Sequence, residues 1–266
     1  MPKQLVPFLV AAAVMLPATK EAWSATADCL AMAGRDGQVQ PASYRPAALE
    51  AGQVQLTFIG HSSFIIESPG GVRIVTDYAG HAGGIVPDVV TMNRAHSSHF
   101  TDAPDPAIKH VLRGWNPGGG RAEHDLVVGD VRIRNVTTDI RGGEVGRQSD
   151  GNSIFIFEIG DLCIGHLGHL HHSLGPEHLA MIGRLDIVLV PVDGGYTMAQ
   201  PEMLAVLKTL KARLVIPMHY FGPSTLGRFI GTLQGSFEVE MASEPVRVLS
   251  SEMLPDRPRL LVLPGY

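Results

Sequence analysis

The chain predicts a layered α/β sandwich, in which mixed sheets are covered by helices. Over the first two thirds, short runs alternate apolar and polar residues with period two, the pattern of strands with one buried face. Over the last third, helical periodicity alternates with short, continuously apolar runs typical of buried strands. Sheets followed by helix–strand units fold into layers around a common core.

Alternating patterns define the strands of the first two thirds. Residues 54–58 alternate apolar and polar side chains, and the runs 64–67 and 72–76 flank the turn sequence 68–71, Ser-Pro-Gly-Gly, which predicts a hairpin. Further strands are expected at 131–134, 154–159 and 162–164. This part of the chain is therefore mostly sheet.

The last third supplies the helices. Residues 201–212 place Met203, Leu204, Leu207 and Leu210 on one helical face. The other elements expected here are helices at 176–185 and 224–233 and buried strands at 186–191 and 214–216.

The N-terminus has the form of an export signal. Lys3 is followed by 12 residues of apolar sequence, 5–16, and by Ala25-Thr26-Ala27, a small-residue cleavage site. Because spanning a bilayer needs roughly 20 apolar residues, we expect cleavage before Asp28 and no stable membrane insertion afterwards. The predicted organisation is a signal peptide at 1–27, a lead segment at 28–52 and one domain at 53–266, in a periplasmic or secreted protein.

Composition indicates an ordinary globular domain. With 18% charged residues and a net charge of -5, the chain gives no electrostatic reason to expect nucleic acid. Cys29 and Cys163 could form a disulfide after export, or Cys163 could be a small buried hydrophobe. The sequence gives no indication of the oligomeric state.

Histidines follow several apolar strand runs. His96 and His99 are three residues apart in the loop 93–99, where both imidazoles could face one cation, although a solvated loop explains the pair equally well. The run 166–172 holds four histidines in seven residues, and at least one of them should be functional. His219 follows the strand 214–216; taken alone, it is better explained as a structural histidine.

Seven segments, in this order, carry a resemblance to the metallo-β-lactamase superfamily. They are 58–64 (FIGHSSF), 74–77 (IVTD), 93–99 (NRAHSSH), 151–155 (GNSIF), 166–168 (HLG), 191–198 (PVDGGYTM) and 216–220 (IPMHY). The chain resembles the branch related to ascorbate-6-phosphate lactonases and similar zinc-dependent hydrolases, over about residues 54–220. The resemblance implies a four-layer αββα sandwich with metal-binding loops along one edge of its two sheets.

The resemblance also shows where the metal motif departs from the family pattern. The family's His-x-His-x-Asp-His loop falls on Arg94, His96, Ser98 and His99, so two of its four ligands are replaced. The next family histidine falls near Thr138-Asp139, and the aspartate that bridges two metals falls on His169. Because an imidazole serves one metal whereas a carboxylate can bridge two, one ion is the simpler expectation.

The resemblance implies metal ligands and supporting residues. His99, His169 and His219 would give three imidazoles with an open fourth position, which suits catalytic zinc, and His96 could be a fourth ligand or hold substrate. Iron, copper and nickel are also compatible with imidazole ligands. The candidate catalytic residues, which could move protons or orient the ligands, are His61, Asp77, Asp139 and His166. A structural hydrogen-bond network explains His61 and Asp77 equally well.

The resemblance, together with the N-terminal signal pattern, implies an exported metal-dependent hydrolase whose small-molecule substrate is an ester, lactone or phosphoester. A metal at this site would lower the pKa of bound water toward about 7 and so supply hydroxide as the nucleophile. Tyr196 and Tyr220 could donate hydrogen bonds to a developing oxyanion, or pack at the rim. The alternative is a non-catalytic metal- or ligand-binding protein on the same fold.

Overall fold

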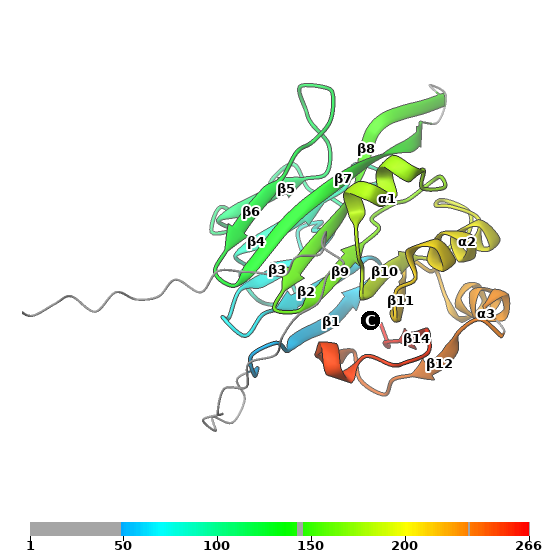
Figure 1. The fold of residues 1–266 in the computed structure, drawn as a ribbon. Helices are drawn as coiled ribbons and strands as arrows, with labels where there is room; N and C mark the ends of the chain where they lie inside the picture. The colour runs from blue at the N-terminus through cyan, green and yellow to red at the C-terminus, as the bar shows by residue number, and fades with distance from the viewer. Residues whose placement is uncertain (1–48, 143–145, 234, 266) are drawn as a thin grey trace, which may run out of the picture.

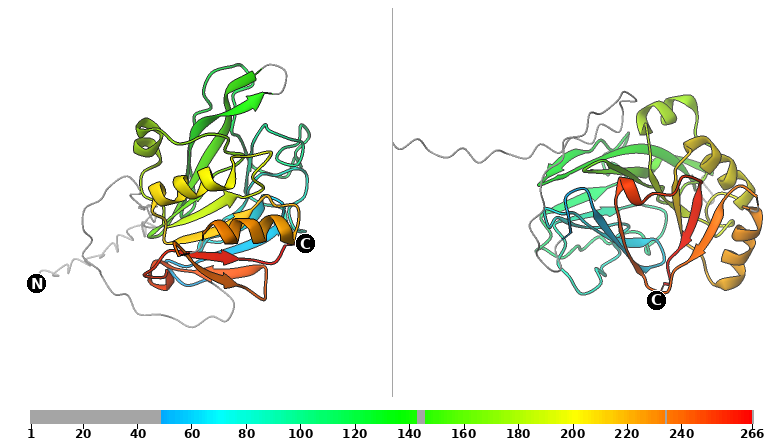
Figure 2. Two further views of the ribbon diagram at one scale, coloured as in Figure 1. Left: turned by 90° about the vertical axis from the view of Figure 1, so that its right-hand side faces the viewer. Right: turned by 60° about the horizontal axis from the view of Figure 1, so that its bottom comes forward.

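The computed structural model describes residues 49–142, 146–233 and 235–265. Two sheets pack face to face, and α-helices lie on one outer side of the pair (Figure 1; Figure 2). The signal sequence at 1–27, most of the lead segment and Cys29 lie outside the described residues, so the expectations about them stay predictions.

The first sheet has six strands in the order β13-β1-β2-β3-β4-β5. Its strands are β1 (Val54–Gly60), β2 (Ser63–Glu67), β3 (Arg73–Val75), β4 (Val89–Met92), β5 (His110–Arg113) and β13 (Val246–Leu249). The predicted hairpin is β2–β3, with Ile66 opposite Ile74. Because β1 and β3 both run antiparallel to β2, and β3, β4 and β5 are parallel, four strands end at one edge.

The second sheet has eight strands in the order β12-β14-β11-β10-β9-β8-β7-β6. They are β6 (Asp125–Val128), β7 (Val131–Gly142), β8 (Gly146–Ile159), β9 (Leu162–His166), β10 (Ile187–Pro191), β11 (Leu214–Met218), β12 (Glu238–Met241) and β14 (Arg259–Val262). The β7–β8 pair extends well beyond the strands expected from the sequence. Strands β9, β10 and β11 are parallel, so their carboxyl ends also share one edge.

Three helices cover the eight-stranded sheet. They are α1 (Pro176–Ile182), α2 (Gln200–Leu210) and α3 (Pro223–Thr232), and a 3-10 turn, η1 (Ser251–Met253), precedes β14. Each α-helix carries proline in its first turn, where the missing amide hydrogen costs nothing. Helix α1 ends earlier than its apolar pattern because Gly183 adopts a φ of 71°. None of the described helices is long and apolar enough to cross a bilayer.

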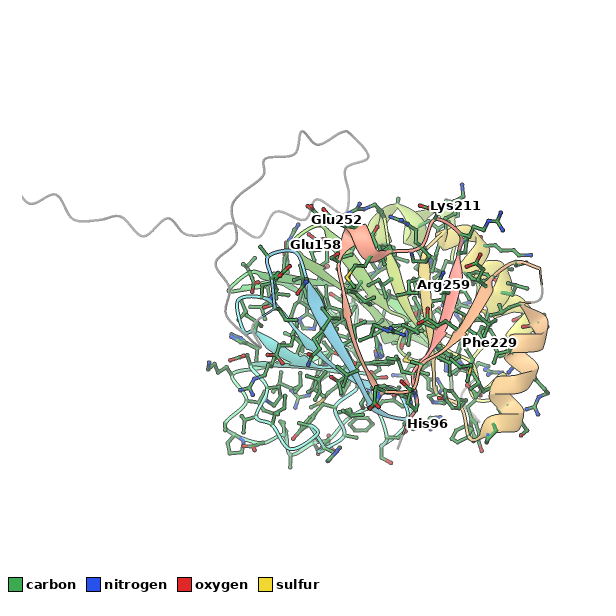
Figure 3. All side chains as sticks on the ribbon, turned by 90° about the horizontal axis from the view of Figure 1, so that it is seen from below. His96, Glu158, Lys211, Phe229, Glu252 and Arg259 are labelled. Carbon is green, nitrogen blue, oxygen red and sulfur yellow. The ribbon has the colours of Figure 1, made fainter. Side chains whose placement is uncertain are left out.

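The main core lies between the two sheets. Phe58 and Phe64 from the first sheet and Phe155 and Phe157 from the second belong to one buried cluster. A second cluster fills the space between the eight-stranded sheet and the helices, where Phe229 of α3 is fully buried (Figure 3). Apolar contact on both faces explains why β9, β10 and β11 are continuously apolar in sequence.

The fold class expected from the sequence is confirmed, with one difference in its outer layer. Within 49–142, 146–233 and 235–265, loops rather than α-helices cover the outer face of the six-stranded sheet. Tyr78 and Trp115 from these loops pack on Val75, Val90 and Met92. Irregular backbone therefore replaces a helical layer beside the loops that carry the histidines.

A buried ion pair holds α1 on the eight-stranded sheet. Arg134 Nε donates to Glu158 Oε1 at 2.7 Å, and both side chains are almost completely buried. The two terminal nitrogens of Arg134 donate to the carbonyl oxygens of Met181 and Ile182, each at 2.7 Å. One guanidinium thus donates to one oxygen of a buried carboxylate and to carbonyls at the end of α1 that no helical amide can reach, and the other carboxylate oxygen lies 3.6 Å from Arg132.

Arg134→Ala should destabilise the protein strongly, because Glu158 Oε1 and two carbonyl oxygens of α1 lose their donor, and only the longer Arg132 contact, at 3.6 Å, remains at the carboxylate. Breaking a buried pair in this way costs about 3–5 kcal/mol in the free energy of unfolding. Urea denaturation followed by circular dichroism measures the loss. The matched control is Lys109→Ala, which removes an exposed pair with Asp88 and should cost less than about 1 kcal/mol. Equal losses in the two variants would contradict this account of the pair.

Candidate metal centre

Three imidazoles meet where the edges of the two sheets come together. His61 follows β1 and His99 lies in the loop after β4, whereas His219 follows β11 of the other sheet. One ring nitrogen from each lies within 4.8 Å of the others, a grouping able to hold a metal ion. His99 and His219 are fully buried, and His61 is partly exposed.

The hydrogen bonds of His99 set its tautomer. Its Nδ1 lies 2.6 Å from Asp77 Oδ2, and the other carboxylate oxygen of Asp77 accepts from the Asn93 amide at 3.0 Å. A carboxylate only accepts, so Nδ1 carries the proton and Nε2 keeps a lone pair. A carboxylate that holds Nδ1 in this way orients the ring and leaves Nε2 free to bind a metal.

His219, on the opposite sheet, also has a carboxylate beside it, although the contact lacks hydrogen-bond geometry. Its Nδ1 lies 3.1 Å from Asp193 Oδ1. Its Nε2 faces His99 Nε2 at 3.1 Å. Two nitrogens bound to one tetrahedral zinc ion at their usual bond length would be about 3.3 Å apart. The facing nitrogens therefore fit a shared metal ion with little movement.

His61 completes the group from the turn between β1 and β2. Its ring centroid is 4.2 Å from that of His219, and its carbonyl accepts the His219 amide at 2.6 Å. Its Nε2 lies 3.2 Å from Ser98 Oγ, so the residue at the family's aspartate position contacts this histidine through a hydroxyl.

The backbone at this centre is strained. His61, Asp77 and His219 have φ values of 51°, 45° and 53°, in the left-handed region that side chains with a Cβ rarely adopt. Such conformations persist only where the surroundings impose them, and they gather at functional sites.

His169 and His96 lie beside the three-histidine group. The His169 ring centroid is 5.0 Å from that of His99 and 4.8 Å from that of His219. Its Nδ1 lies 2.6 Å from His171 Nε2, whereas its buried Nε2 has no hydrogen-bond partner among the described residues. His96 is exposed (Figure 3). Its ring centroid lies 4.8 Å from that of His169. Both predicted ligands are thus near the centre, outside the tight group of nitrogens.

The remaining candidate catalytic residues have separate positions. His166 is fully buried; its Nδ1 accepts the Gly168 amide, so its Nε2 donates to the Ser62 carbonyl at 2.8 Å and ties β9 to the turn that carries His61. Asp139 pairs with Arg147 and accepts the Asp150 amide at 3.0 Å, on the long β7–β8 hairpin. The contacts of Asp139 connect it to that hairpin and not to the three histidines.

Sequence reasoning missed several supporting residues. Asp193, after β10, accepts the amides of Gly195 and Thr197, and the turn sequence Asp-Gly-Gly was the available signal. His171, one of the four histidines in 166–172, is partly buried against His169. Arg94, which replaces the first ligand of the family's metal loop, is exposed.

Burial keeps several of these imidazoles neutral. Burial, with the charges of His219 and His99, lowers the pKa of His61 to about 4. Burial and the charge of Arg141 lower the pKa of His171 to about 4. The pKa values of His169 and His96 also fall, mainly through burial. For Asp77, burial would raise the pKa, but its interactions with His99, His166 and Asn93 outweigh it and hold the pKa well below its usual range.

Fold and site together define a metallo-β-lactamase domain. A family model described as the Beta-lactamase superfamily domain matches residues 55–219, which span β1 through His219. The chain therefore belongs to the metallo-β-lactamase superfamily.

Individual relatives are more distant. The chain is 28% identical to a Thermotoga maritima protein assigned to the Zn-dependent hydrolases of this superfamily, with a TM-score of 0.59 over 80% of this chain and 100% of the other. A metallo hydrolase from Ignicoccus hospitalis, 19% identical, has a TM-score of 0.54 over 74% of this chain and 99% of its own and supports the fold alone. A metal-dependent hydrolase from Thermococcus onnurineus is 25% identical over 63% of this chain and 84% of its own length.

The metal-free protein should lose stability as the pH falls from about 6.5 toward 4. Over this range the unfolded histidines, with a pKa of about 6.5, bind protons that folded His61 and His171 do not, so acid favours the unfolded state. Urea midpoints at pH 7 and pH 5 measure the effect. In the variant His61→Gln, the urea midpoint should change less between pH 7 and pH 5 than in the wild type. A wild-type midpoint that is unchanged or higher at pH 5 would contradict the lowered pKa values of His61 and His171.

Proposed function

We propose that this chain is an exported metal-dependent hydrolase with one metal ion, held by His61, His99 and His219. The observation that carries the proposal is the pair of facing Nε2 atoms of His99 and His219, 3.1 Å apart. Carboxylates behind both rings, Asp77 and Asp193, support imidazoles oriented as ligands. The metal-dependent hydrolases similar to this chain support the reaction class.

One ion is a better proposal than two because of what replaces the other family ligands. Arg94 is exposed and offers no lone pair, and Ser98 contacts His61 instead of supplying a carboxylate. Asp139 is engaged with Arg147. Zinc is the first choice for a site of three imidazoles, and iron, copper or nickel would also be compatible with it.

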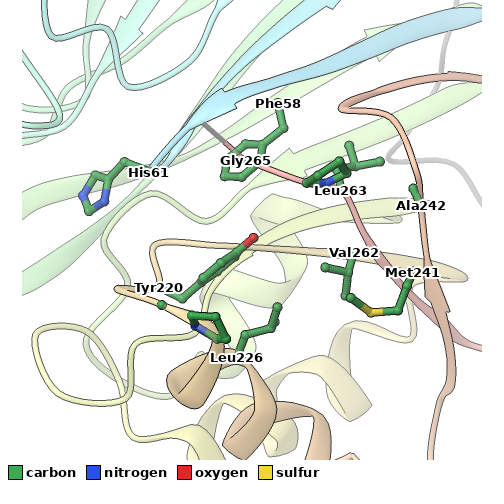
Figure 4. Close-up of a pocket in the computed structure, with 12 residues that line it drawn as sticks. Phe58, His61, Tyr220, Leu226, Met241, Ala242, Val262, Leu263 and Gly265 are labelled. Atoms are coloured by element: carbon green, nitrogen blue, oxygen red, sulfur yellow. The ribbon is translucent and has the colours of Figure 1, made fainter.

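Two cavities adjoin the histidines and indicate a small substrate. One, of about 450 Å³, is mostly apolar and has His61 at one end and Met241 and Val262 at the other (Figure 4). The other, of about 220 Å³, is lined by His96, Arg141, His169 and Tyr196 among others. We propose that the apolar cavity holds the carbon skeleton of the substrate and the polar one its charged or polar end.

These surroundings suit hydrolysis of a small ester, lactone or phosphoester. A bound metal ion would polarise a carbonyl or phosphoryl oxygen and supply the Lewis acid. The chain's own residues orient the ligands through Asp77 and Asp193, and His166 fixes the turn that carries His61. His61 is partly exposed and His96 is exposed, so the centre is open toward solvent on one side.

His99→Ala and His219→Ala should each remove tight metal binding and leave the fold intact. Each variant deletes one of two facing ligand nitrogens, so zinc affinity should fall at least tenfold, the loss of about 1.4 kcal/mol that a single lost ligand readily exceeds. Inductively coupled plasma mass spectrometry of the purified variants gives the metal content, and circular dichroism reports the fold.

The matched control for these variants is His81→Ala, which changes an exposed histidine outside the group. Unchanged metal content in either site variant would refute the ligand assignment. Wild-type protein that binds metal but hydrolyses no ester, lactone or phosphoester would favour the non-catalytic binding protein.

Ala242→Phe should narrow the substrate range without changing metal content. Ala242 lines the apolar cavity away from the histidines, so a phenyl ring there would occupy part of its volume. We expect kcat/KM for esters with long acyl chains to fall about tenfold, equivalent to about 1.4 kcal/mol, with little change for acetyl esters. An equal loss for both substrates would contradict the proposed role of the cavity.

Export is proposed from the N-terminal sequence, in which an apolar stretch precedes Ala25-Thr26-Ala27. Expression of the full chain in a Gram-negative host should give a periplasmic protein whose N-terminal residue, by mass spectrometry, is Asp28. Replacing Ala25 and Ala27 with bulky residues should leave the precursor uncleaved. A cytoplasmic product that begins at Met1 would exclude this localisation.

A further inference from the structure

The ring nitrogens of His169 have a protonation pattern that its neighbours determine. Arg141 Nε donates to His171 Nδ1 at 3.0 Å, and a guanidinium can only donate. His171 Nδ1 therefore accepts, and the neutral ring of His171 carries its proton on Nε2. That nitrogen lies 2.6 Å from His169 Nδ1, which must in turn accept.

The consequence for His169 is a proton on Nε2, in a ring whose centroid lies 5.0 Å from that of His99 and 4.8 Å from that of His219. With Nδ1 accepting, a neutral imidazole holds its hydrogen on Nε2, and an N–H group has no lone pair for a metal. This is the nitrogen that is buried without a hydrogen-bond partner among the described residues. His99 has the opposite tautomer, because Asp77 takes the proton of its Nδ1.

Arg141, the first donor in this series of hydrogen bonds, is held by a loop of the backbone. One terminal nitrogen of Arg141 donates to the carbonyl oxygens of Gly195, Tyr196 and Thr197, at 2.9, 3.0 and 2.6 Å. Since arginine stays protonated at any pH a folded protein meets, the direction of donation from Arg141 through His171 to His169 is fixed. The fixed charge also lies in the wall of the 220 Å³ cavity that His169 lines.

We propose that His169 is a hydrogen-bond donor to an oxyanion of the substrate, not a metal ligand, and that Arg141 and His171 are positioning residues that set its tautomer. The donor lies beside His99 and His219, where a phosphoryl or carboxylate oxygen held by the metal would gather negative charge. The inference rests on the proposed function for the identity of the acceptor, whereas the tautomer itself does not depend on it.

Two substitutions at position 171 separate the proposal from a merely structural role. His171→Gln keeps the direction, because its carbonyl accepts from Arg141 and its amide donates to His169. His171→Glu reverses it, because a carboxylate accepts from both neighbours and would draw the proton of His169 to Nδ1. The two side chains have nearly the same size, so differences between them report the direction of donation.

The tautomer is read in the metal-free full-length protein by nitrogen-15 NMR of the histidine rings, with His169 assigned from the spectrum of His169→Gln. We expect the proton of His169 on Nε2 in the wild type and in His171→Gln, and on Nδ1 in His171→Glu. A proton on Nδ1 in the wild type would overturn the proposal, whether or not the protein binds metal.

Cobalt(II) then tests whether His169 belongs to the ligand set. The visible spectrum of the cobalt-loaded protein should be the same in wild type and His169→Ala. In the His171→Glu background, where His169 gains a free lone pair, His169→Ala should change it. A spectral change in the wild-type background would show that His169 is a ligand and would overturn the proposal. Failure of the wild type to bind cobalt or zinc would instead count against the proposed function.

Inorganic phosphate is the probe for the donor. Calorimetric titration of the zinc-loaded protein should show phosphate affinity falling about tenfold or more in His169→Ala, the usual effect of losing a hydrogen bond to a charged group. His169→Gln, which retains an N–H donor, should recover most of the loss. Equal phosphate affinity in wild type and His169→Ala would overturn the oxyanion role.

Discussion

The contact between His99 and His219 is the one on which the site depends, because it joins the two sheets at the edge where their parallel strands end. His99 belongs to the six-stranded sheet and His219 to the eight-stranded sheet, and their Nε2 atoms meet at 3.1 Å. Neither ring can approach the other unless the sheets pack closely through the phenylalanine core between them. Packing across the whole interface thus fixes the distance between two nitrogens, and left-handed backbone at His61, Asp77 and His219 turns the supporting side chains toward them.

Charge around this contact is arranged differently from the family pattern implied by the sequence. Two buried carboxylates, Asp77 and Asp193, stand behind the imidazoles rather than between metal ions. The position of the bridging carboxylate holds His169, whose environment favours the neutral ring. A centre with its negative charge behind the ligands, and neutral or positive groups in front, is compatible with the anionic substrate proposed above as well as with a cation.

Much of the fold and part of the site could be predicted from the sequence. Alternating and continuously apolar runs locate most central strands, and histidines directly after them indicate the functional edge. The role of His61 beside His219 was harder to predict, since it depends on a left-handed turn and on a sheet contact more than 150 residues away in sequence. Asp139 illustrates the reverse case: its position matched the motif, but a bulge in β7 and the nearby Arg147 keep it on the hairpin. Such outcomes depend on pairings between distant residues, which local patterns do not encode.

The short loop 195–197 has a consequence for how this site can evolve. Asp193 accepts hydrogen bonds from the loop amides of Gly195 and Thr197, and Arg141 donates to the carbonyl oxygens of the same two residues. One peptide segment thus makes hydrogen bonds to both side chains. Asp193 lies beside His219, and Arg141 contacts His171, which in turn contacts His169. A change of loop length or of either side chain would disturb both imidazoles together. We therefore expect homologues to keep or lose this loop together with Arg141, His171 and Asp193. Covariation of these residues would mark the homologues that have a histidine in place of the bridging carboxylate.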